Sequence, residues 1–288
     1  MEVSELKARI RDLGMTPNKR LGQHFLCDEA TANRQVQYAN VGNNDTVLEI
    51  GPGLGILTGI LSTRAKRVVA VEADPAAADY IERTYEDVEI IRGDVLKVDL
   101  PEFDKVVSNL PFNISSPITF KLLDEPFDSG ILMYQKEFAE RLVASEGDED
   151  YSRLSVNAFY RADCEILETV PRTLFYPVPR VDASIVRIEP RHPPFEVINE
   201  EHFFKVVNAL FSHRRKQIRN SLMLEWMSLS DTKESMAQFV SGLPGSQRRV
   251  EELSPKEIGE LSNRIIEEKL NLAKGHHSTT SSAQDKER

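Results

Sequence analysis

The sequence predicts an α/β fold: a mainly parallel sheet with helices on both faces, followed by a small all-helical domain. One observation is the alternation of strand-like apolar segments with helix-like segments between residues 46 and 145, which is typical of parallel sheets. Another is that only helical patterns follow residue 191. The third is size, because 288 residues with 40% apolar content can form one large and one small core. We expect three parts, at 1–190, 191–272 and 273–288, the last a disordered tail.

Helix caps and apolar periodicity place the elements along the chain. Residues 1–15 have the pattern of an amphipathic helix. Asp28 and Asp74 are favoured helix N-caps, and they predict helices to about residues 38 and 85. The strands expected from apolar runs are 46–50, 67–72, 88–91, 104–108, 129–134, 162–170 and 183–189. The other expected helices are 56–64, 116–124, 136–145, 200–211, 214–226, 231–240 and 254–272.

The strongest local pattern is a strand, a tight turn and a helix between residues 46 and 64. The turn carries glycines at 51, 53 and 55, which permit sharp bends and let a flat ligand approach the backbone. The next strand ends in Glu72, an acid that can accept hydrogen bonds from both hydroxyls of a ribose. The sequence therefore predicts a nucleoside site at this edge of the sheet.

The order of the glycines distinguishes two classes of ligand. The loop has the sequence Gly-Pro-Gly-Leu-Gly and not Gly-x-Gly-x-x-Gly, so the arrangement that seats a pyrophosphate on a helix N-terminus is missing. A nucleoside without phosphates, such as S-adenosylmethionine, suits this loop better than a dinucleotide. A nucleotide-linked dehydrogenase is therefore the weaker alternative.

Two further strands end in polar residues at the edge where open α/β sheets bind their ligands. Asp94 follows the strand at 88–91, and the tetrapeptide 109–112, Asn-Leu-Pro-Phe, follows the strand at 104–108. Because the carboxyl ends of parallel strands meet at one edge, we expect both groups to lie near Glu72 and the glycine loop.

The tetrapeptide has the groups needed to hold an adenine for methylation. The Asn109 amide oxygen and the Leu110 carbonyl oxygen can accept hydrogen bonds from an exocyclic amine. Pro111 keeps the preceding residue extended and so turns that carbonyl outward. Phe112 offers a ring on which the base can stack. Methyl transfer from a sulfonium needs no nucleophilic side chain, so positioning and electrostatics should carry the catalysis.

Composition restricts the setting of this reaction. The two cysteines, Cys27 and Cys164, are far apart and belong to no CxxC motif, so we expect neither a disulfide nor a metal site. The chain lacks a long apolar run and a signal-peptide pattern, which favours a cytoplasmic protein without membrane contact. The pattern also contains no heptad repeat, so we expect a monomer.

The net charge of −10 and the pI of about 5.3 limit any nucleic-acid contact to local basic patches. The charges alone favour no single patch. The candidates are Lys19 with Arg20, the run from His213 to Arg219, Arg172 with Arg180, and Arg248 with Arg249.

Five motifs in order resemble the family of small-subunit ribosomal RNA adenine N6,N6-dimethyltransferases. The resemblance covers roughly residues 15 to 270. It implies a Rossmann-like class I methyltransferase domain that binds S-adenosylmethionine and a helical domain that binds RNA. The motifs are Gln23-His-Phe-Leu26, Glu49-Ile-Gly-Pro-Gly53, Glu72 with Gly93-Asp94, Asn109-Leu-Pro-Phe112 and Phe175-Tyr-Pro-Val-Pro179.

The activity implied by the resemblance is dimethylation of N6 on two adjacent adenosines in the 3′-terminal hairpin of small-subunit rRNA. The substrate would be that rRNA within the small subunit or its precursor, which also implies a role in subunit biogenesis. Two alternatives stay open: methylation of large-subunit rRNA adenine, and a ribosome-assembly factor that acts mainly by binding the immature small subunit.

The resemblance also implies roles for the cofactor-binding residues. His24 and Leu26 would line the methionine end of the cofactor, and Gly51 would approach its amino-acid part. Glu72 would hold the ribose, and Asp94 would bind the adenine amine. Many relatives have Asn where this chain has His24, so the contact made by this side chain stays open.

The acceptor base would be held by a second group of residues. By the resemblance, Asn109 would touch both the cofactor and the target adenine, and Leu110 and Pro111 would shape the same site. Phe112 and Phe175 would stack on either side of the base, which must leave its helix to reach the methyl group. Some relatives have Tyr in place of Phe112, but either ring can stack.

Overall fold

The computed structural model describes residues 3–15, 17 and 22–281 of the chain. They form two compact units. The first comprises Met1–Val143 and Arg161–His192, and the second comprises Ala144–Tyr160 and Pro193–Arg288. The second unit thus includes residues 144–160, which the sequence analysis placed in the first part.

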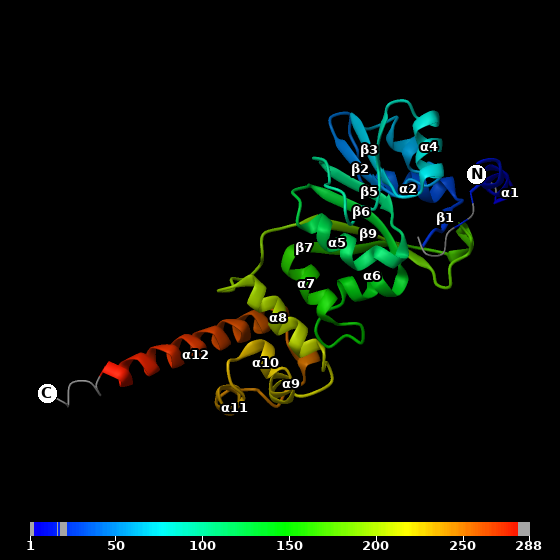
Figure 1. Ribbon diagram of the computed structural model, residues 1–288. Helices are drawn as coiled ribbons and strands as arrows, with labels where there is room; N and C mark the ends of the chain where they lie inside the picture. Colours follow the sequence, from blue (N-terminus) through cyan, green and yellow to red (C-terminus); the bar gives the residue numbers. More distant parts are fainter. Residues whose placement is uncertain (1–2, 16, 18–21, 282–288) are drawn as a thin grey trace. The chain divides into compact units, whose positions relative to one another are not determined.

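The first unit is built on a seven-stranded sheet with the order β4-β3-β2-β5-β6-β9-β7 (Figure 1). β2 to β6 pair in parallel, whereas β9 runs antiparallel to both β6 and β7. The expected mainly parallel sheet is therefore confirmed. Its strands are β2 (Thr46–Ile50), β3 (Arg67–Glu72), β4 (Val88–Arg92), β5 (Lys105–Asn109), β6 (Ser129–Gln135), β7 (Ala162–Val170) and β9 (Ala183–Pro190).

A second, two-stranded sheet joins distant parts of the first unit. β1 (Phe25–Leu26) pairs antiparallel with β8 (Phe175–Tyr176). Periodicity could not predict these strands, because two residues contain no repeat. The pairing brings the motif around His24 next to the motif around Phe175, and the order of the motifs along the chain did not show this.

Capping explains where two helices of this unit begin. The Asp28 carboxylate accepts a hydrogen bond from the Thr31 amide, and the Asp74 carboxylate accepts from the amides of Ala76 and Ala77. Both predicted caps are confirmed. The helices are α1 (Val3–Asp12), α2 (Glu29–Tyr38), α3 (Thr58–Leu61), α4 (Pro75–Thr84), α5 (Ser115–Leu123) and α6 (Lys136–Val143).

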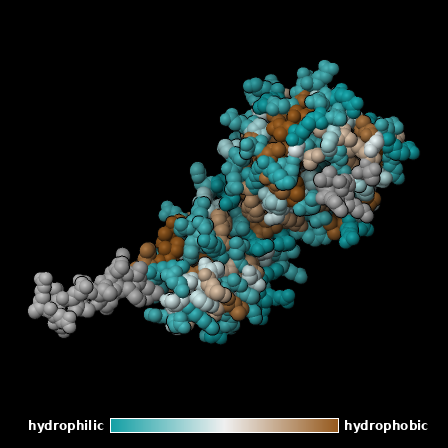
Figure 2. All heavy atoms as spheres, viewed as in Figure 1, coloured by the Kyte–Doolittle hydropathy of each residue, from teal (hydrophilic) through white to brown (hydrophobic). Residues whose placement is uncertain are grey.

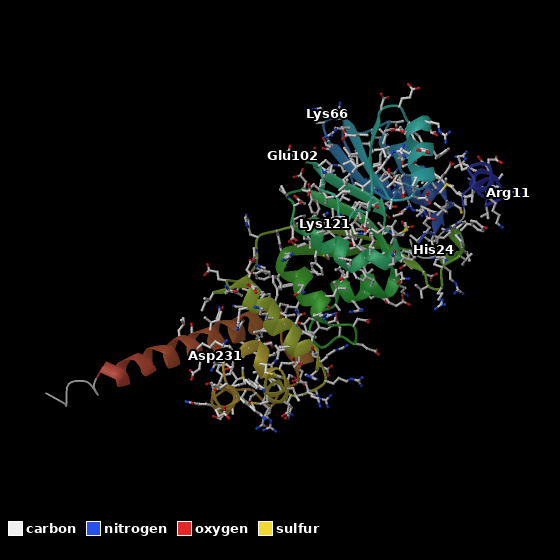
Figure 3. All side chains as sticks on the ribbon, in the orientation of Figure 1. Arg11, His24, Lys66, Glu102, Lys121 and Asp231 are labelled. Atoms are coloured by element: carbon white, nitrogen blue, oxygen red, sulfur yellow. The ribbon has the colours of Figure 1, made fainter. Side chains whose placement is uncertain are left out.

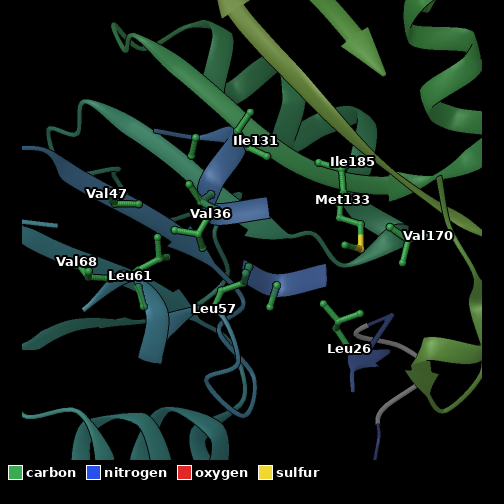
Figure 4. Close-up of a cluster of buried hydrophobic side chains, with 14 of the residues drawn as sticks. Leu26, Val36, Val47, Leu57, Leu61, Val68, Ile131, Met133, Val170 and Ile185 are labelled. Carbon is green, nitrogen blue, oxygen red and sulfur yellow. The ribbon is translucent and has the colours of Figure 1, made fainter. Parts of the chain in front are cut away.

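The core of the first unit lies between the sheet and its helices (Figure 4). Val36 of α2 and Leu61 of α3 are fully buried against strand residues such as Val47 and Ile131. Each such side chain contributes about 1.5–3 kcal/mol of apolar burial. Packing of this density fixes the strand ends from which the polar residues project.

The second unit is helical, with its own apolar core. Residues 144–160 belong to it because Tyr151 and Val156 are buried in this core, and the Tyr151 hydroxyl donates to the Leu253 carbonyl at 2.8 Å. Helix α12 extends to Ser281, beyond residue 273 where we expected a tail, and residues 282–288 lie outside the described residues. The helices are α7 (Arg153–Arg161), α8 (Glu200–Phe211), α9 (Ile218–Leu224), α10 (Trp226–Leu229), α11 (Lys233–Ser241) and α12 (Pro255–Ser281).

The surface carries mostly polar side chains. Figure 2 shows a mainly hydrophilic face with small, scattered apolar patches. Among the described residues, no helix combines the length and the apolar content needed to cross a bilayer. The same residues also contain no cluster of three or more side chains suited to hold a metal ion.

Candidate active site

A pocket of about 340 Å³ lies at the carboxyl ends of the central parallel strands in the first unit. This volume is in the range of small-molecule sites. Every site residue expected from the sequence lines it. They are His24, Leu26, Gly51, Glu72, Asp94, Asn109, Leu110, Pro111, Phe112 and Phe175.

The pocket opens where the strand order of the sheet reverses, between β2 and β5. The backbone pairing of these strands is registered only at Val47 with Lys105 and Leu48 with Val106. Beyond that point the Ser108 hydroxyl donates to the Ile50 carbonyl at 2.5 Å. A side chain thus bridges the strands where the backbone ladder stops, and the space beyond it is the crevice that open α/β sheets use for ligands.

The glycine loop follows directly on β2 and has a backbone that favours glycine. Gly51 and Gly53 have φ of 67° and 57°, in the left-handed region. A Cβ on Gly53 would lie 3.0 Å from the Phe25 ring, so a side chain at this position would also crowd that ring. The Gly53 amide donates to the Glu72 carboxylate at 3.2 Å, which ties the loop to the end of β3.

Two buried carboxyl groups line the pocket. Glu49 and Glu72 are 2% and 6% exposed. Burial raises the pKa of Glu49 to about 8, with a further increase from nearby Glu72, and burial also raises the pKa of Glu72. No Lys or Arg is among the described residues that line the pocket. Such a site disfavours phosphates and suits a ligand that carries positive charge.

Asp94 lies in the turn after β4, as the sequence indicated. Its Oδ1 atom accepts from the Leu96 amide at 3.0 Å, and Oδ2 lies 3.5 Å from the exposed Lys97 ammonium. The carboxylate lines the pocket and is oriented by its own turn. It can therefore accept a hydrogen bond from an amine with little rearrangement.

Asn109 ends β5 with an unused acceptor. Its Oδ1 atom is buried and has no hydrogen-bond partner among the described residues. Leaving such a group unpaired costs about 1–3 kcal/mol, and a ligand N–H would remove that cost. Pro111 follows with φ −58° and ψ 122°, and a short 3₁₀ turn begins at Phe112, which places the tetrapeptide along the pocket wall.

The aromatic side of the pocket joins the two-stranded sheet to the tetrapeptide. The His24 ring stacks on Phe112 at a centroid distance of 5.6 Å, and its Nδ1 atom lies 2.7 Å from the Pro177 carbonyl oxygen. Because a carbonyl only accepts, Nδ1 must carry the hydrogen. Phe175 is 2% exposed and packs in the core as well as lining the pocket. Figure 3 labels His24 in this region.

The pocket also contains residues that sequence reasoning did not select. Glu49 belongs to the motif Glu49-Ile-Gly-Pro-Gly53, but the sequence does not show how deeply an acid within an apolar strand is buried. Leu6 lines the pocket from α1, where the amphipathic pattern indicated burial but not a position. Ser108 does not line the pocket, but it bridges two strands next to it from a strand interior, where a serine gives no signal of its own.

These features fit S-adenosylmethionine. Its positive charge suits the buried acids, its ribose hydroxyls suit Glu72, and it has no phosphate that would require a Lys or Arg. The reversed strand order, the antiparallel β9, the glycine loop and this pocket define an S-adenosylmethionine-dependent class I methyltransferase.

The chain belongs to the ribosomal RNA adenine dimethylase family, whose model matches residues 14–265. It is 47% identical over 250 residues to a probable ribosomal RNA small subunit methyltransferase A from Methanosarcina acetivorans, covering 85% of this chain and 92% of the relative. A protein of the same description from Thermococcus gammatolerans is 44% identical over 246 residues, covering 85% and 87%. The protein is therefore an rRNA adenine dimethyltransferase that uses S-adenosylmethionine.

Solved structures agree with this family. A dimethyladenosine transferase from Plasmodium falciparum matches with a TM-score of 0.71 and 28% identity, covering 83% of this chain and 95% of that chain. The 23S rRNA methyltransferase ErmE matches with a TM-score of 0.62 and 28% identity, covering 84% and 99%. ErmE acts on 23S rRNA by its name, whereas the name of the other enzyme specifies no RNA, so the fold alone does not decide which rRNA is methylated.

Proposed function

We propose that this enzyme dimethylates N6 of two adjacent adenosines in the 3′-terminal hairpin of small-subunit rRNA, as a monomer in the cytoplasm. The observation that carries the chemistry is the buried, unpaired Asn109 Oδ1 atom at the edge of an acidic pocket. The relatives described as small subunit methyltransferase A favour the small subunit as the substrate particle.

The tetrapeptide would act on the amine of the target adenine. Asn109 Oδ1 and the Leu110 carbonyl would accept its two N–H groups and favour the pyramidal nitrogen that can attack a methyl group. Phe112 and Phe175 would stack against the base, and Pro111 would hold the Leu110 carbonyl in place. S-adenosylmethionine supplies a methyl group already activated on its sulfonium. As the new N–C bond forms, the methyl–sulfur bond breaks and S-adenosylhomocysteine is left, and the amine nitrogen releases its proton to solvent water.

Separate residues would hold the cofactor. Glu72 would accept from the ribose hydroxyls, and Asp94 from the adenine amine. Gly51 would permit close approach of the amino-acid part, with His24 and Leu26 along the methionine end. The carboxyl groups of the pocket attract this positively charged ligand. The described lining residues include no Lys or Arg that would repel it.

The helical unit would bind the RNA through a basic surface formed by Arg215, Lys216, Arg219 and Arg249. The sequence separates these residues into two clusters, but an isolated bridge pairs Gln217 with Arg249 and brings the clusters together. All four side chains are exposed. Arg214 pairs with Glu251 at 3.3 Å and is only partly exposed, so it is less available for phosphates. Arg249 also lies 3.7 Å from Glu251, but its side chain is more exposed. Lys19 and Arg20, another candidate, lie outside the described residues.

The test is transfer of labelled methyl groups to small subunits that lack the modification, followed by mapping of the labelled bases. We expect label on two adjacent small-subunit adenosines. Asn109→Ala should lower the rate about 10²–10³-fold, because it removes an acceptor that positions the attacking nitrogen. The control is Ser184→Ala, which removes a buried hydroxyl from a different strand, β9.

Two outcomes would overturn parts of this proposal. Label on large subunits would favour the alternative that the similarity to ErmE raises. Tight binding of small subunits without any transfer would instead support an assembly factor and contradict the role of Asn109.

A further inference from the structure

Helix α1 forms part of the pocket wall, although it precedes the region that the family model matches. The match begins at residue 14, whereas α1 spans Val3–Asp12. Leu6 of this helix lines the pocket and is 1% exposed. The region matched by the family model therefore does not include α1, which forms one wall of the pocket.

The apolar face of α1 packs over one particular part of the site. Leu6 and Ile10 belong to a small cluster with Leu54 of the glycine loop, and Phe25 of β1 packs against that cluster. Phe25 is also the ring that lies against Gly53. The helix thus stands over the space between the glycine loop and β1, where the methionine end of the cofactor is expected.

Polar contacts attach α1 to both sides of the pocket. On the α4 side, Arg9 Nη1 donates to the Tyr80 hydroxyl at 2.9 Å, and the guanidinium lies 5.8 Å from the Tyr80 ring centroid. On the β8 side, Lys7 Nζ lies 4.9 Å from the Tyr176 ring centroid. α4 follows Glu72, which is expected to bind the cofactor, and β8 contains Phe175, which is expected to contact the target adenine. Helix α1 therefore contacts elements from both parts of the site. Cation–π contacts at exposed side chains are weak enough to break and re-form readily.

We propose that α1 closes the pocket over bound S-adenosylmethionine, with Leu6 as its apolar contact and with Lys7 and Arg9 as its attachments. A covered cofactor dissociates only when the helix moves, so α1 slows cofactor exchange. It also excludes water from the buried acids, which strengthens their attraction to a positive ligand. This inference rests on the S-adenosylmethionine site and does not depend on which rRNA adenosine is methylated.

The first experiment measures the dissociation rate of S-adenosylhomocysteine from the full-length protein by stopped-flow mixing, without RNA. Leu6→Ala should raise this rate about tenfold, the effect of losing roughly half of a leucine's apolar burial. Lys7→Ala with Arg9→Ala should raise it about threefold. Leu6→Met should restore slow dissociation, because its side chain has a similar volume.

The matched control is Arg11→Ala on the exposed face of the same helix, labelled in Figure 3. It should leave the dissociation rate unchanged. In steady-state assays, Leu6→Ala should raise KM for S-adenosylmethionine by a larger factor than it lowers kcat. A lower melting temperature with unchanged dissociation would assign Leu6 a purely structural role and overturn the proposal.

Amide hydrogen exchange tests the helix itself. If α1 covers the ligand, exchange in residues 3–12 should slow when S-adenosylmethionine is added to the wild-type protein, and less so in Leu6→Ala. Protection confined to the glycine loop and β3 would show that the ligand binds without the helix, and this would contradict closure by α1.

Discussion

At the scale of single residues, the buried carboxyls determine what the pocket accepts. Glu72 could be found from the sequence, because its distance from the glycines and its place at a strand end are both readable. Glu49 could not, because the depth of an acid within a strand depends on which helices cover that strand. The Glu49 carboxyl accepts from the buried Thr58 hydroxyl at 2.7 Å, and its hydrogen bonds with Thr58 do not offset the effect of burial on its pKa.

Glu49 should make the stability of the ligand-free protein depend on pH. Its pKa is raised to about 8, so the folded protein binds a proton that the unfolded chain releases near pH 4.5. The stabilising effect is complete below pH 4.5 and is lost as the pH rises through about 8. At pH 8, Glu49→Gln should be more stable than wild type by a few kcal/mol, since each pKa unit corresponds to about 1.4 kcal/mol.

Urea unfolding between pH 5 and 9 would measure this effect. The free energy of unfolding of the wild type should fall with pH relative to that of Glu49→Gln. Glu102→Gln, at an exposed position labelled in Figure 3, should follow the wild type. Parallel curves for wild type and Glu49→Gln would mean that Glu49 is ionised at little cost in the folded protein.

At the scale of elements, the sequence gives strands and helices but not their spatial order. Apolar runs and two Asp caps located β2 to β6 and most helices, because these signals are local. The insertion of antiparallel β9 between β6 and β7, and the pairing of β1 with β8, depend on contacts between distant segments. Helix α7 was missed because it has only 9 residues and follows an acidic loop, so few turns show a period.

The junction of β2 and β5 should be sensitive to one hydroxyl. Ser108→Ala removes the bond to the Ile50 carbonyl and leaves that buried acceptor without its partner, at a cost of about 1–3 kcal/mol. Gln35 donates from α2 to the carbonyls of Ser108 and Ile131, so the strand itself should stay in place. The expected result is lower stability together with a lower kcat, because Asn109 is the next residue along β5.

Ser184→Ala is the matched control for this change. Ser184 is 1% exposed, compared with 0% for Ser108, and lies in the same sheet, but its hydroxyl has no partner among the described residues. Removing it should cost nothing or stabilise the protein slightly. Urea unfolding and methyl transfer, measured for both variants, distinguish the effect of losing the Ser108 hydrogen bond from the effect of removing any buried hydroxyl. Equal losses in the two variants would show that the Ser108 bridge has no special role.

At the scale of the whole molecule, an acidic enzyme must bind a polyanion. The net charge of −10 gives no general attraction to RNA, so binding depends on local positive charge. The sequence could locate the basic clusters around residues 215 and 249 but could not show that they adjoin, since the bridge between Gln217 and Arg249 spans a long stretch of chain. Folding thus brings together basic side chains that are far apart in the sequence.

The basic surface should therefore dominate affinity for the small subunit and its salt dependence. Reversing Arg215 and Lys216 to Glu should weaken binding by at least tenfold near physiological salt, because each lost phosphate contact also removes a released counterion. The slope of log affinity against log salt should become less negative by about 2. The control with the same change in net charge is Lys66→Glu with Lys233→Glu, at exposed positions outside this surface. If both double variants lose affinity equally, net charge and not the basic surface governs binding. If neither does, the RNA is bound elsewhere on the enzyme.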